Sequence, residues 1–261
     1  MGDALAGRVA LITGASRGIG AAIALRMAAE GAAVAIVARS LEPGSGGHLA
    51  GSLRETADTI VAAGGTAFPI VADLSDVACD RTAIVTRATE ALGPIDVLVN
   101  NAAACFYLSI DETSERRLRV AYEVNVITPY LLTKAVVPGM RDRGAGWIVN
   151  ITSAIVDTNQ LDSPQQARSS TYAPSKAALD RLTVSFAAEL QGTGIAVNAL
   201  APERAVATEG ATAVMDLPPE WCEPVETMAE AAVALATCDP ERENGLVVRS
   251  GPYLRAKGLV L

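Results

Sequence analysis

A tyrosine and a lysine four residues apart are the side chains of this sequence best suited to move a proton. Tyr172 and Lys176 stand four positions apart, so on a helix they share one face. A free phenol has a pKa of about 10, which makes it a poor acid and a rare base near neutrality. An ammonium group roughly 4 Å away, at an effective dielectric constant near 20, favours the phenolate by about 4 kcal/mol, or about three pKa units. The pair therefore predicts a general acid or base near pH 7.

The neighbouring residues decide between this interpretation and a chance spacing of a surface lysine beside a half-buried tyrosine. Residues 147–151 form an apolar run of strand length, and Ser153 lies just past its carboxyl end. Open α/β sheets bind ligands at the carboxyl ends of their strands. Pro174 is tolerated in the first turn of a helix, so the helix is expected to start close to Tyr172.

A glycine-rich turn near the amino terminus is a candidate phosphate site. Residues 8–13 form an apolar strand, and Gly14, Gly18 and Gly20 follow before an alanine-rich helical pattern. Gly14 can make the sharp turn, Gly18 lets backbone approach a pyrophosphate, and Gly20 allows close helix packing. The helix amino terminus adds free N–H groups. An ordinary turn with spare glycines is the weaker interpretation, because the pattern has the required strand and helix around it.

The end of the second expected strand bears on the choice between NAD and NADP. In a dinucleotide fold this position faces the adenosine ribose, where an arginine accommodates the 2′-phosphate of NADP. Arg39 and Ser40 stand there, and Arg17 lies in the glycine turn. These residues favour NADP(H), although either arginine could be a solvated surface charge and Glu42 is nearby.

Asp73 and Asn125 each allow two interpretations. Asp73 follows the expected strand 67–71, so it could accept a hydrogen bond from an adenine amino group or cap the next helix. Asn125 lies inside the helical pattern 114–140, where Pro129 should kink the helix or mark a boundary. A buried amide is costly unless it is bonded, so Asn125 is either a structural link or part of a site.

Seven apolar runs of strand length alternate with six helical patterns. This alternation predicts an α/β fold of the Rossmann type, with a doubly wound, seven-stranded parallel sheet between two layers of helices. No linker divides the chain, so residues 1–261 are expected to form one domain. The expected strands are 8–13, 33–38, 67–71, 95–99, 147–151, 195–200 and 246–249. The first expected helix runs from the glycine turn to Glu30, and the other five are 52–63, 81–92, 114–140, 172–191 and 225–236.

Composition and charge exclude several classes of function. The 21 basic and 29 acidic side chains give a formal charge of −8, which argues against nucleic acid or an anionic membrane surface as a partner. Four scattered cysteines and one histidine form no zinc pattern, so no metal is expected. His48 lies in a glycine-rich loop and is assigned no role. No signal peptide or membrane-length apolar run is found, so a cytoplasmic protein is expected.

The motifs together resemble those of the short-chain dehydrogenase/reductase family over nearly the whole chain. They are TGASRGIG at 13–20, Asn-Asn-Ala at 100–102, Asn125, ITS at 151–153, YAPSK at 172–176 and VNALAP at 197–202. The loop after Ser40 and the run at 198–208 are similar to the hydroxysteroid-dehydrogenase-like branch.

The resemblance implies a role for each residue that matches a motif. Tyr172 would protonate a carbonyl oxygen, Ser153 would hydrogen-bond that oxygen, and Lys176 would lower the phenol pKa and hold the nicotinamide ribose. Asn125 would hold a water that links Lys176 to solvent. The helices that carry Asn125 and Tyr172 would form a homodimer or homotetramer interface. The implied cofactor residues are Gly14, Ser16, Arg17, Gly18, Ile19, Gly20, Arg39, Ser40, Asp73, Leu74, Asn101, Ala102, Tyr172, Lys176, Pro202 and Thr208.

Four positions depart from the family pattern. Ala103 stands where the family has a glycine, and its methyl group narrows the expected cofactor site. Glu203 also replaces a glycine and puts a charge near the expected nicotinamide pocket. Thr208 sits one residue later than the usual cofactor-contacting threonine, and the stretch from Ser153 to Tyr172 is longer than usual.

The expected function is an NADP(H)-dependent interconversion of a ketone and a secondary alcohol. A substrate loop at about 203–224 carries Met215, Leu217 and Trp221, which either line an apolar pocket or pack on the body of the fold. Lining a pocket would favour a hydrophobic small-molecule substrate such as a steroid, terpenoid or fatty-acyl ketone. The alternative is a dinucleotide-binding regulator or scaffold without turnover, which Ala103 and Glu203 suggest.

Overall fold

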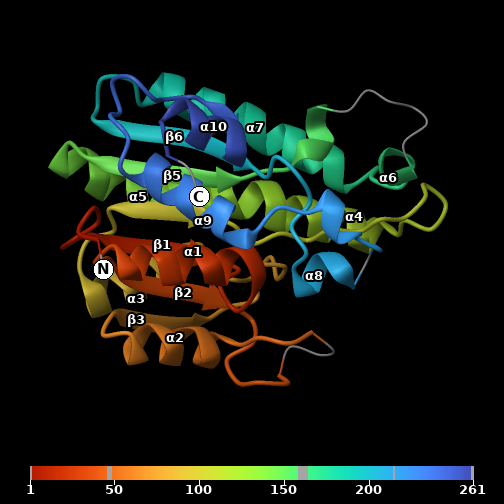
Figure 1. Ribbon diagram of the computed structural model, residues 1–261, viewed down its shortest axis with the longest axis horizontal. Coiled ribbons are helices and arrows are strands. Elements are labelled where there is room, and N and C mark those ends of the chain that lie inside the picture. Colours follow the sequence, from red (N-terminus) through yellow and green to blue (C-terminus); the bar gives the residue numbers. More distant parts are fainter. Residues whose placement is uncertain (1, 46–48, 158–163, 214, 260–261) are drawn as a thin grey trace.

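One parallel sheet forms the centre of the molecule (Figure 1). The computed structural model describes residues 2–45, 49–157, 164–213 and 215–259. Its strand order is β3-β2-β1-β4-β5-β6-β7, so the predicted doubly wound, seven-stranded sheet is confirmed. The strands are β1 Val9–Thr13, β2 Ala33–Ala38, β3 Thr66–Val71, β4 Val97–Asn100, β5 Gly146–Ile151, β6 Ile195–Ala201 and β7 Val247–Arg249.

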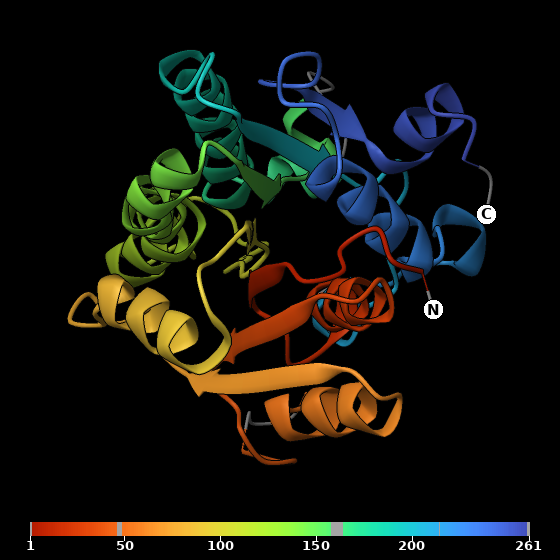
Figure 2. The same ribbon diagram turned by 90° about the vertical axis from the view of Figure 1, so that its left-hand side faces the viewer.

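Helices cover both faces of the sheet, as Figure 2 shows. On one face α1, α2, α9 and α10 pack over an apolar cluster that includes Ile23, Ile60 and Met228. On the other face α3, α5 and α7 pack over a second cluster that includes Ile84 and Leu132. The helices are α1 Gly18–Ala29, α2 Leu53–Ala62, α3 Arg81–Leu92, α4 Glu115–Tyr122, α5 Thr128–Arg143, α6 Pro164–Ala167, α7 Tyr172–Glu189, α8 Glu209–Thr212, α9 Val225–Ala236 and α10 Ser250–Ala256.

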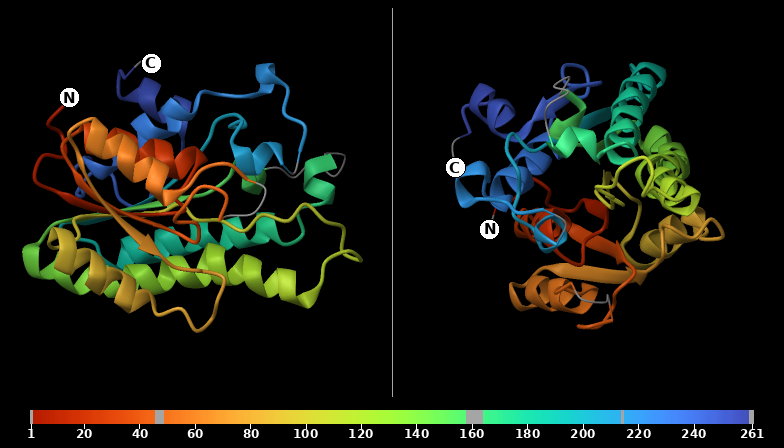
Figure 3. Two further views of the ribbon diagram at one scale, coloured as in Figure 1. Left: turned by 90° about the horizontal axis from the view of Figure 1, so that it is seen from below. Right: turned by 90° about the vertical axis from the view of Figure 1, so that its right-hand side faces the viewer.

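The strands form because continuous apolar runs can be buried on both faces of a parallel sheet. The residues of β6 are buried without exception, and those of β1 likewise. The left panel of Figure 3 shows the sheet enclosed between the two helical layers. This burial fixes the strand ends, and therefore the loops that leave them.

The expected single helix over 114–140 is divided into three parts. A π-helical turn, η1 Glu123–Ile127, separates α4 from α5, and α5 continues to Arg143. Pro129 lies in the first turn of α5, so its prediction as a boundary is confirmed. Apolar periodicity could not reveal η1, because one extra residue in a turn hardly changes the pattern.

Three short α-helices in the described part of the chain were not predicted. These are α6, α8 and α10; α6 and α8 have four residues each and α10 has seven. Helices this short carry too little periodicity to be recognised, and α10 follows β7 without a turn. In Figure 1, α4, α6 and α8 gather beyond the carboxyl ends of the strands, on the right. The predicted site residues lie at the same end.

Candidate active site

The first turns of α7 carry the predicted proton-transfer pair. Helix α7 begins at Tyr172, as the sequence predicted. Lys176 is 1% exposed, and its Nζ donates to the carbonyl oxygen of Ile151 at 2.7 Å. The same Nζ lies 5.8 Å from the centre of the Tyr172 ring. Ser153, two residues beyond Ile151, makes a polar contact with Tyr172. The three predicted side chains therefore meet at the end of β5.

Burial dominates the protonation of this pair. It raises the pKa of Tyr172 above its usual value, a negative charge on Cys105 acts in the same direction, and the contact with Ser153 opposes the shift. Burial also lowers the pKa of Lys176 to about 8, while Cys105 and Asp180 favour its charged form. The expected lowering of the phenol pKa by Lys176 is therefore wrong for this arrangement. At neutral pH Tyr172 therefore holds its proton in this arrangement.

Asn125 links two parts of the site through its side chain. It lies in η1 and is fully buried. Its amide nitrogen donates to the Ala104 carbonyl and to Ser175 Oγ, each at 2.9 Å, and its amide oxygen accepts from the Ala104 N–H at 2.8 Å. Asn125 thus joins the segment after β4 to α7. Of the two roles considered for it, this is the structural link. The water-holding role that the resemblance implied stays a prediction.

The glycine turn is packed against the residues that follow β4. Asn101 donates from its side-chain amide to the carbonyl oxygens of Thr13 at 2.8 Å and Gly14 at 3.2 Å. A Cβ at Gly20 would lie 2.3 Å from that amide nitrogen and 2.4 Å from the Gly14 oxygen. Asn101 therefore fastens the turn rather than projecting freely. Thr13, whose hydroxyl accepts from the N–H groups of Asn101 and Ala102 at 3.0 Å, was not predicted.

The two arginines expected at the adenosine end differ in their surroundings. Arg17 Nη2 donates to the Gly51 carbonyl at 3.2 Å, and its Nη1 is buried without a hydrogen-bond partner in the described part of the chain. Arg39 is exposed, and the adjacent Ser40 is 5% exposed. Arg39 lies near enough to Asp73 for its charge to act on that carboxyl.

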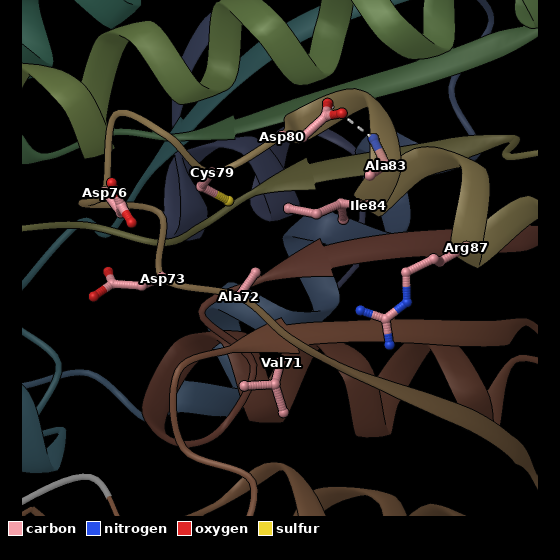
Figure 4. A pocket seen from close by; sticks show the side chains of 9 residues that line it. All are labelled: Val71, Ala72, Asp73, Asp76, Cys79, Asp80, Ala83, Ile84 and Arg87. Atoms are coloured by element: carbon pink, nitrogen blue, oxygen red, sulfur yellow. Dashed lines mark hydrogen bonds between the residues drawn. The ribbon is translucent and has the colours of Figure 1, made fainter.

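Asp73 does not cap the helix that follows it. Its Oδ1 accepts from Ser75 N–H and Oγ at 2.9 and 2.7 Å, whereas Asp80 caps α3. Burial opposes ionisation of Asp73, but the bonds from Ser75 and the charge of Arg39 outweigh it and lower its pKa. Asp73 also borders a cavity of about 300 Å³, seen in Figure 4, between the end of β3 and α3. Leu74 beside it is buried.

Two departures from the family pattern take unexpected positions. Glu203 turns away from the site and binds Arg255 with both carboxylate oxygens, at 2.9 and 3.1 Å. The charge expected near the nicotinamide pocket is thus paired with Arg255. Thr208 packs on the glycine turn, because a Cβ at Gly18 would lie 2.9 Å from Thr208 Cγ2. Pro202 lies at the end of β6 and is half-buried, and Ala103 is exposed.

The segment after the Asn-Asn-Ala motif contributes residues that the sequence did not identify. Tyr107 places its ring centre 6.1 Å from that of Tyr172, at an interplanar angle of 57°. Cys105 lies close enough to Lys176 for their charges to interact. The only feature of the sequence that could have pointed to these residues is an aromatic side chain soon after a run of small residues. Among the described loop residues, Trp221 is 56% exposed and Met215 and Leu217 are half-buried.

The remaining predictions concern cysteines, metals and membranes. All four cysteines are free thiols. Within the described ranges, no three histidine, cysteine or acidic side chains gather as metal ligands. No helix in the described part of the chain is long and apolar enough to cross a membrane. His48 lies outside the described residues.

The residues present fit a nicotinamide dinucleotide. Gly14 and Gly18 have φ values of 69° and 53°, a left-handed conformation that glycine adopts without strain. The glycine turn leads directly into the amino terminus of α1. Nη1 of Arg17 has no hydrogen-bond partner among the described residues. A phosphorylated ligand could approach the backbone of the glycine turn closely. The free N–H groups of α1 and the positively charged Arg17 would both attract its phosphate.

Comparisons with known proteins identify the class. The family model described as short chain dehydrogenase matches residues 8–216. Hydroxysteroid dehydrogenase-like protein 2 from Mus musculus is 36% identical over 236 residues, which cover 88% of this chain and 46% of that protein. This chain therefore spans about half the length of that relative.

Solved structures of the same class differ in the dinucleotide that they hold. A metagenomic short-chain oxidoreductase in complex with NADP is 33% identical, with a TM-score of 0.76 over 94% of this chain and 98% of that one. A short-chain dehydrogenase from Mycobacterium paratuberculosis bound to NAD is 29% identical, with a TM-score of 0.79 over 94% and 96%. The chain belongs to the short-chain dehydrogenase/reductase family, whose members are oxidoreductases acting on CH–OH groups.

Proposed function

We propose that this chain reduces a ketone to a secondary alcohol, and catalyses the reverse reaction, with Tyr172 as the proton donor. The observation that carries the proposal is the meeting of Tyr172, Lys176 and Ser153 at the carboxyl end of β5. A protonated phenol beside a hydroxyl can hold a carbonyl oxygen by two hydrogen bonds and release a proton to it. Asn125 keeps α7 aligned with the segment after β4.

NADPH, when bound, supplies the hydride for this reduction. The glycine turn would hold the pyrophosphate, and Lys176 would hold the nicotinamide ribose. Because Lys176 Nζ now donates to the Ile151 carbonyl, it needs only a local movement to reach another acceptor. Thr208 packs over Gly18 and would cover the same turn.

Transfer of deuterium tests this reaction directly. The purified protein is incubated with NADPH deuterated at C4 and a panel of ketones, and the alcohols are analysed by mass spectrometry. We expect deuterium on the carbinol carbon of at least one product. Release of no deuterated alcohol from any ketone, with intact NADPH recovered, would contradict the proposal.

We propose further that NADP(H) is preferred over NAD(H). Support comes from the exposed Arg39 near Asp73 and from the orphaned Arg17 Nη1, which together offer two cations to a 2′-phosphate. Charge-assisted hydrogen bonds to such a group contribute about 1.5–3 kcal/mol.

Titration of nicotinamide fluorescence tests the preference. Arg39→Ala should weaken NADPH binding by about 10-fold or more and leave NADH binding nearly unchanged. Arg242→Ala, a change at a side chain 85% exposed, is the matched control. Equal affinities for NADPH and NADH in the unmodified protein would refute the preference.

We propose further that the substrate is hydrophobic, that the chain assembles with a second copy of itself, and that the protein is cytoplasmic. The half-buried Met215 and Leu217 support an apolar substrate such as a steroid, terpenoid or fatty-acyl ketone.

An exposed apolar surface on neighbouring helices suits a homodimer. Its residues are Ile127, Tyr130 and Val184, which are 43, 46 and 36% exposed. The regulator hypothesis rested on Ala103 and Glu203, and Glu203 pairs with Arg255.

A further inference from the structure

The segment from Ala104 to Leu108 is held in place along its whole length. Asn125 exchanges hydrogen bonds with the backbone of Ala104. Thr171 Oγ1 donates to the Phe106 carbonyl at 3.5 Å, and Leu108 forms a parallel bridge with Ser169. The segment is thus fixed by η1 on one side and by the residues just before α7 on the other. Side chains that it projects have defined positions.

Two of those side chains are directed at the proton-transfer pair. Tyr107 packs its ring at a tilt against Tyr172, and a charge on Tyr172 acts on it. Cys105, two residues earlier, interacts with the charges of Tyr172 and Lys176. Both side chains therefore lie near the proton-transfer pair.

Among the described residues, the polar partner of the Tyr107 phenol is a weak acceptor. Burial raises its pKa, so it stays a neutral donor. Its polar contact is the thiol of Cys105, whose own pKa burial raises to about 11. A neutral thiol is a weak hydrogen-bond acceptor, so an oxygen atom on a substrate can replace it with a gain in free energy.

We propose that Tyr107 is a specificity-determining residue, which donates a hydrogen bond to a second oxygen of the substrate while Tyr172 and Ser153 hold the reacting carbonyl. The inference rests on the proposed ketone reduction. A hydrogen bond from Tyr107 would favour those apolar ketones that carry a further hydrogen-bond acceptor close to the ketone, such as an ester or acyl carbonyl.

A matched pair of probes isolates the second oxygen. Ethyl 3-oxohexanoate and nonan-4-one have the same number of chain atoms and the same ketone position, but only the former carries a second carbonyl. The ratio of their kcat/KM values is measured for each variant. Dividing a variant's ratio by that of the unmodified protein cancels the different intrinsic reactivities of the two ketones.

Three variants give an order that a merely structural role would not produce. Tyr107→Phe keeps the ring and removes the donor, so the ratio should fall about 10-fold. Cys105→Ser offers Tyr107 a stronger internal acceptor that competes with the substrate, so the ratio should fall a few-fold. Cys105→Ala frees the phenol and should leave the ratio equal or higher.

Equilibrium binding separates this inference from the proposed reaction. In the Tyr172→Phe background, binding of ethyl 3-oxohexanoate followed by ligand-observed NMR should weaken about 10-fold on adding Tyr107→Phe. A ratio unchanged in Tyr107→Phe, in a protein whose turnover depends on Tyr172, would overturn the role of Tyr107 alone. Absence of Tyr172-dependent turnover would instead overturn the proposed function, and binding would still report on Tyr107.

Discussion

Burial, rather than the neighbouring ammonium group, sets the protonation of the side chains in the site. From the spacing of Tyr172 and Lys176 we could predict a shared helix face, and α7 confirms it. The spacing could not show that Lys176 Nζ would donate to Ile151, or that both groups would lie in a desolvated space. The pairing of Glu203 could not be predicted for a similar reason, since its partner Arg255 lies 52 residues away in the chain.

The depressed pKa of Lys176 predicts a pH-dependent stability. The folded state holds this group with a pKa of about 8, whereas the unfolded chain has the ordinary value of about 10.4. Between these values the unfolded state binds more protons, so the free energy of unfolding rises with pH from about 8 to about 10.4. Lys176→Met removes this contribution.

Urea denaturation at a series of pH values measures the effect. The stability of the unmodified protein minus that of Lys176→Met should increase by as much as roughly 3 kcal/mol between pH 7 and 10.5. Lys134→Met, at an exposed lysine of α5, is the matched control and should give a flat difference. A flat difference for Lys176→Met as well would contradict the burial of a charged amine.

At the level of elements, a buried ion pair ties the adenosine end of the site to η1. Arg81 is 3% exposed, and its Nη2 donates to Glu123 Oε1 at 2.7 Å and to the Leu74 carbonyl at 2.9 Å. Its guanidinium also reaches Thr128 Oγ1. Strand and helix periodicity predicted α3, which carries Arg81, but not η1, which carries Glu123. It could not predict this link, because a charged residue in a helical pattern is normally assigned to the surface.

Removing one partner of this pair should cost more than removing both. Arg81→Met leaves Glu123 buried without its partner, so we expect a loss of about 3–5 kcal/mol in the free energy of unfolding. Arg81→Met with Glu123→Met should recover most of that loss. Arg119→Met, which breaks the exposed pair with Glu115, should have little measurable effect. Additive losses in the double variant would show that the two side chains do not interact.

For the whole molecule, the sequence could predict the sheet but not its surface. Apolar runs of strand length specify buried parallel strands, so the sheet followed from pattern alone. The faces that helices leave exposed depend on how they pack, which no local pattern contains. The apolar surface of Ile127, Tyr130 and Val184 became visible only when η1, α5 and α7 were placed side by side.

This surface makes a prediction about assembly. Val184→Arg should shift the protein from dimer to monomer, because it would bury an unpaired charge in the interface. Multi-angle light scattering after size-exclusion chromatography measures the mass. Val61→Arg, on the exposed side of α2 and 59% exposed, is the matched control. A mass unchanged by Val184→Arg, whether that of a monomer or of a dimer, would rule out this face as the contact.

The central claim is that Tyr172 donates the proton in ketone reduction. We would measure single-turnover oxidation of NADPH by a ketone substrate, in the unmodified protein, in Tyr172→Phe, and in Tyr130→Phe as a control on the surface of α5. We expect Tyr172→Phe to slow the reaction by about 10²- to 10⁴-fold with NADPH affinity nearly unchanged, since only proton transfer is removed. Turnover by Tyr172→Phe at the rate of the unmodified protein would contradict the claim.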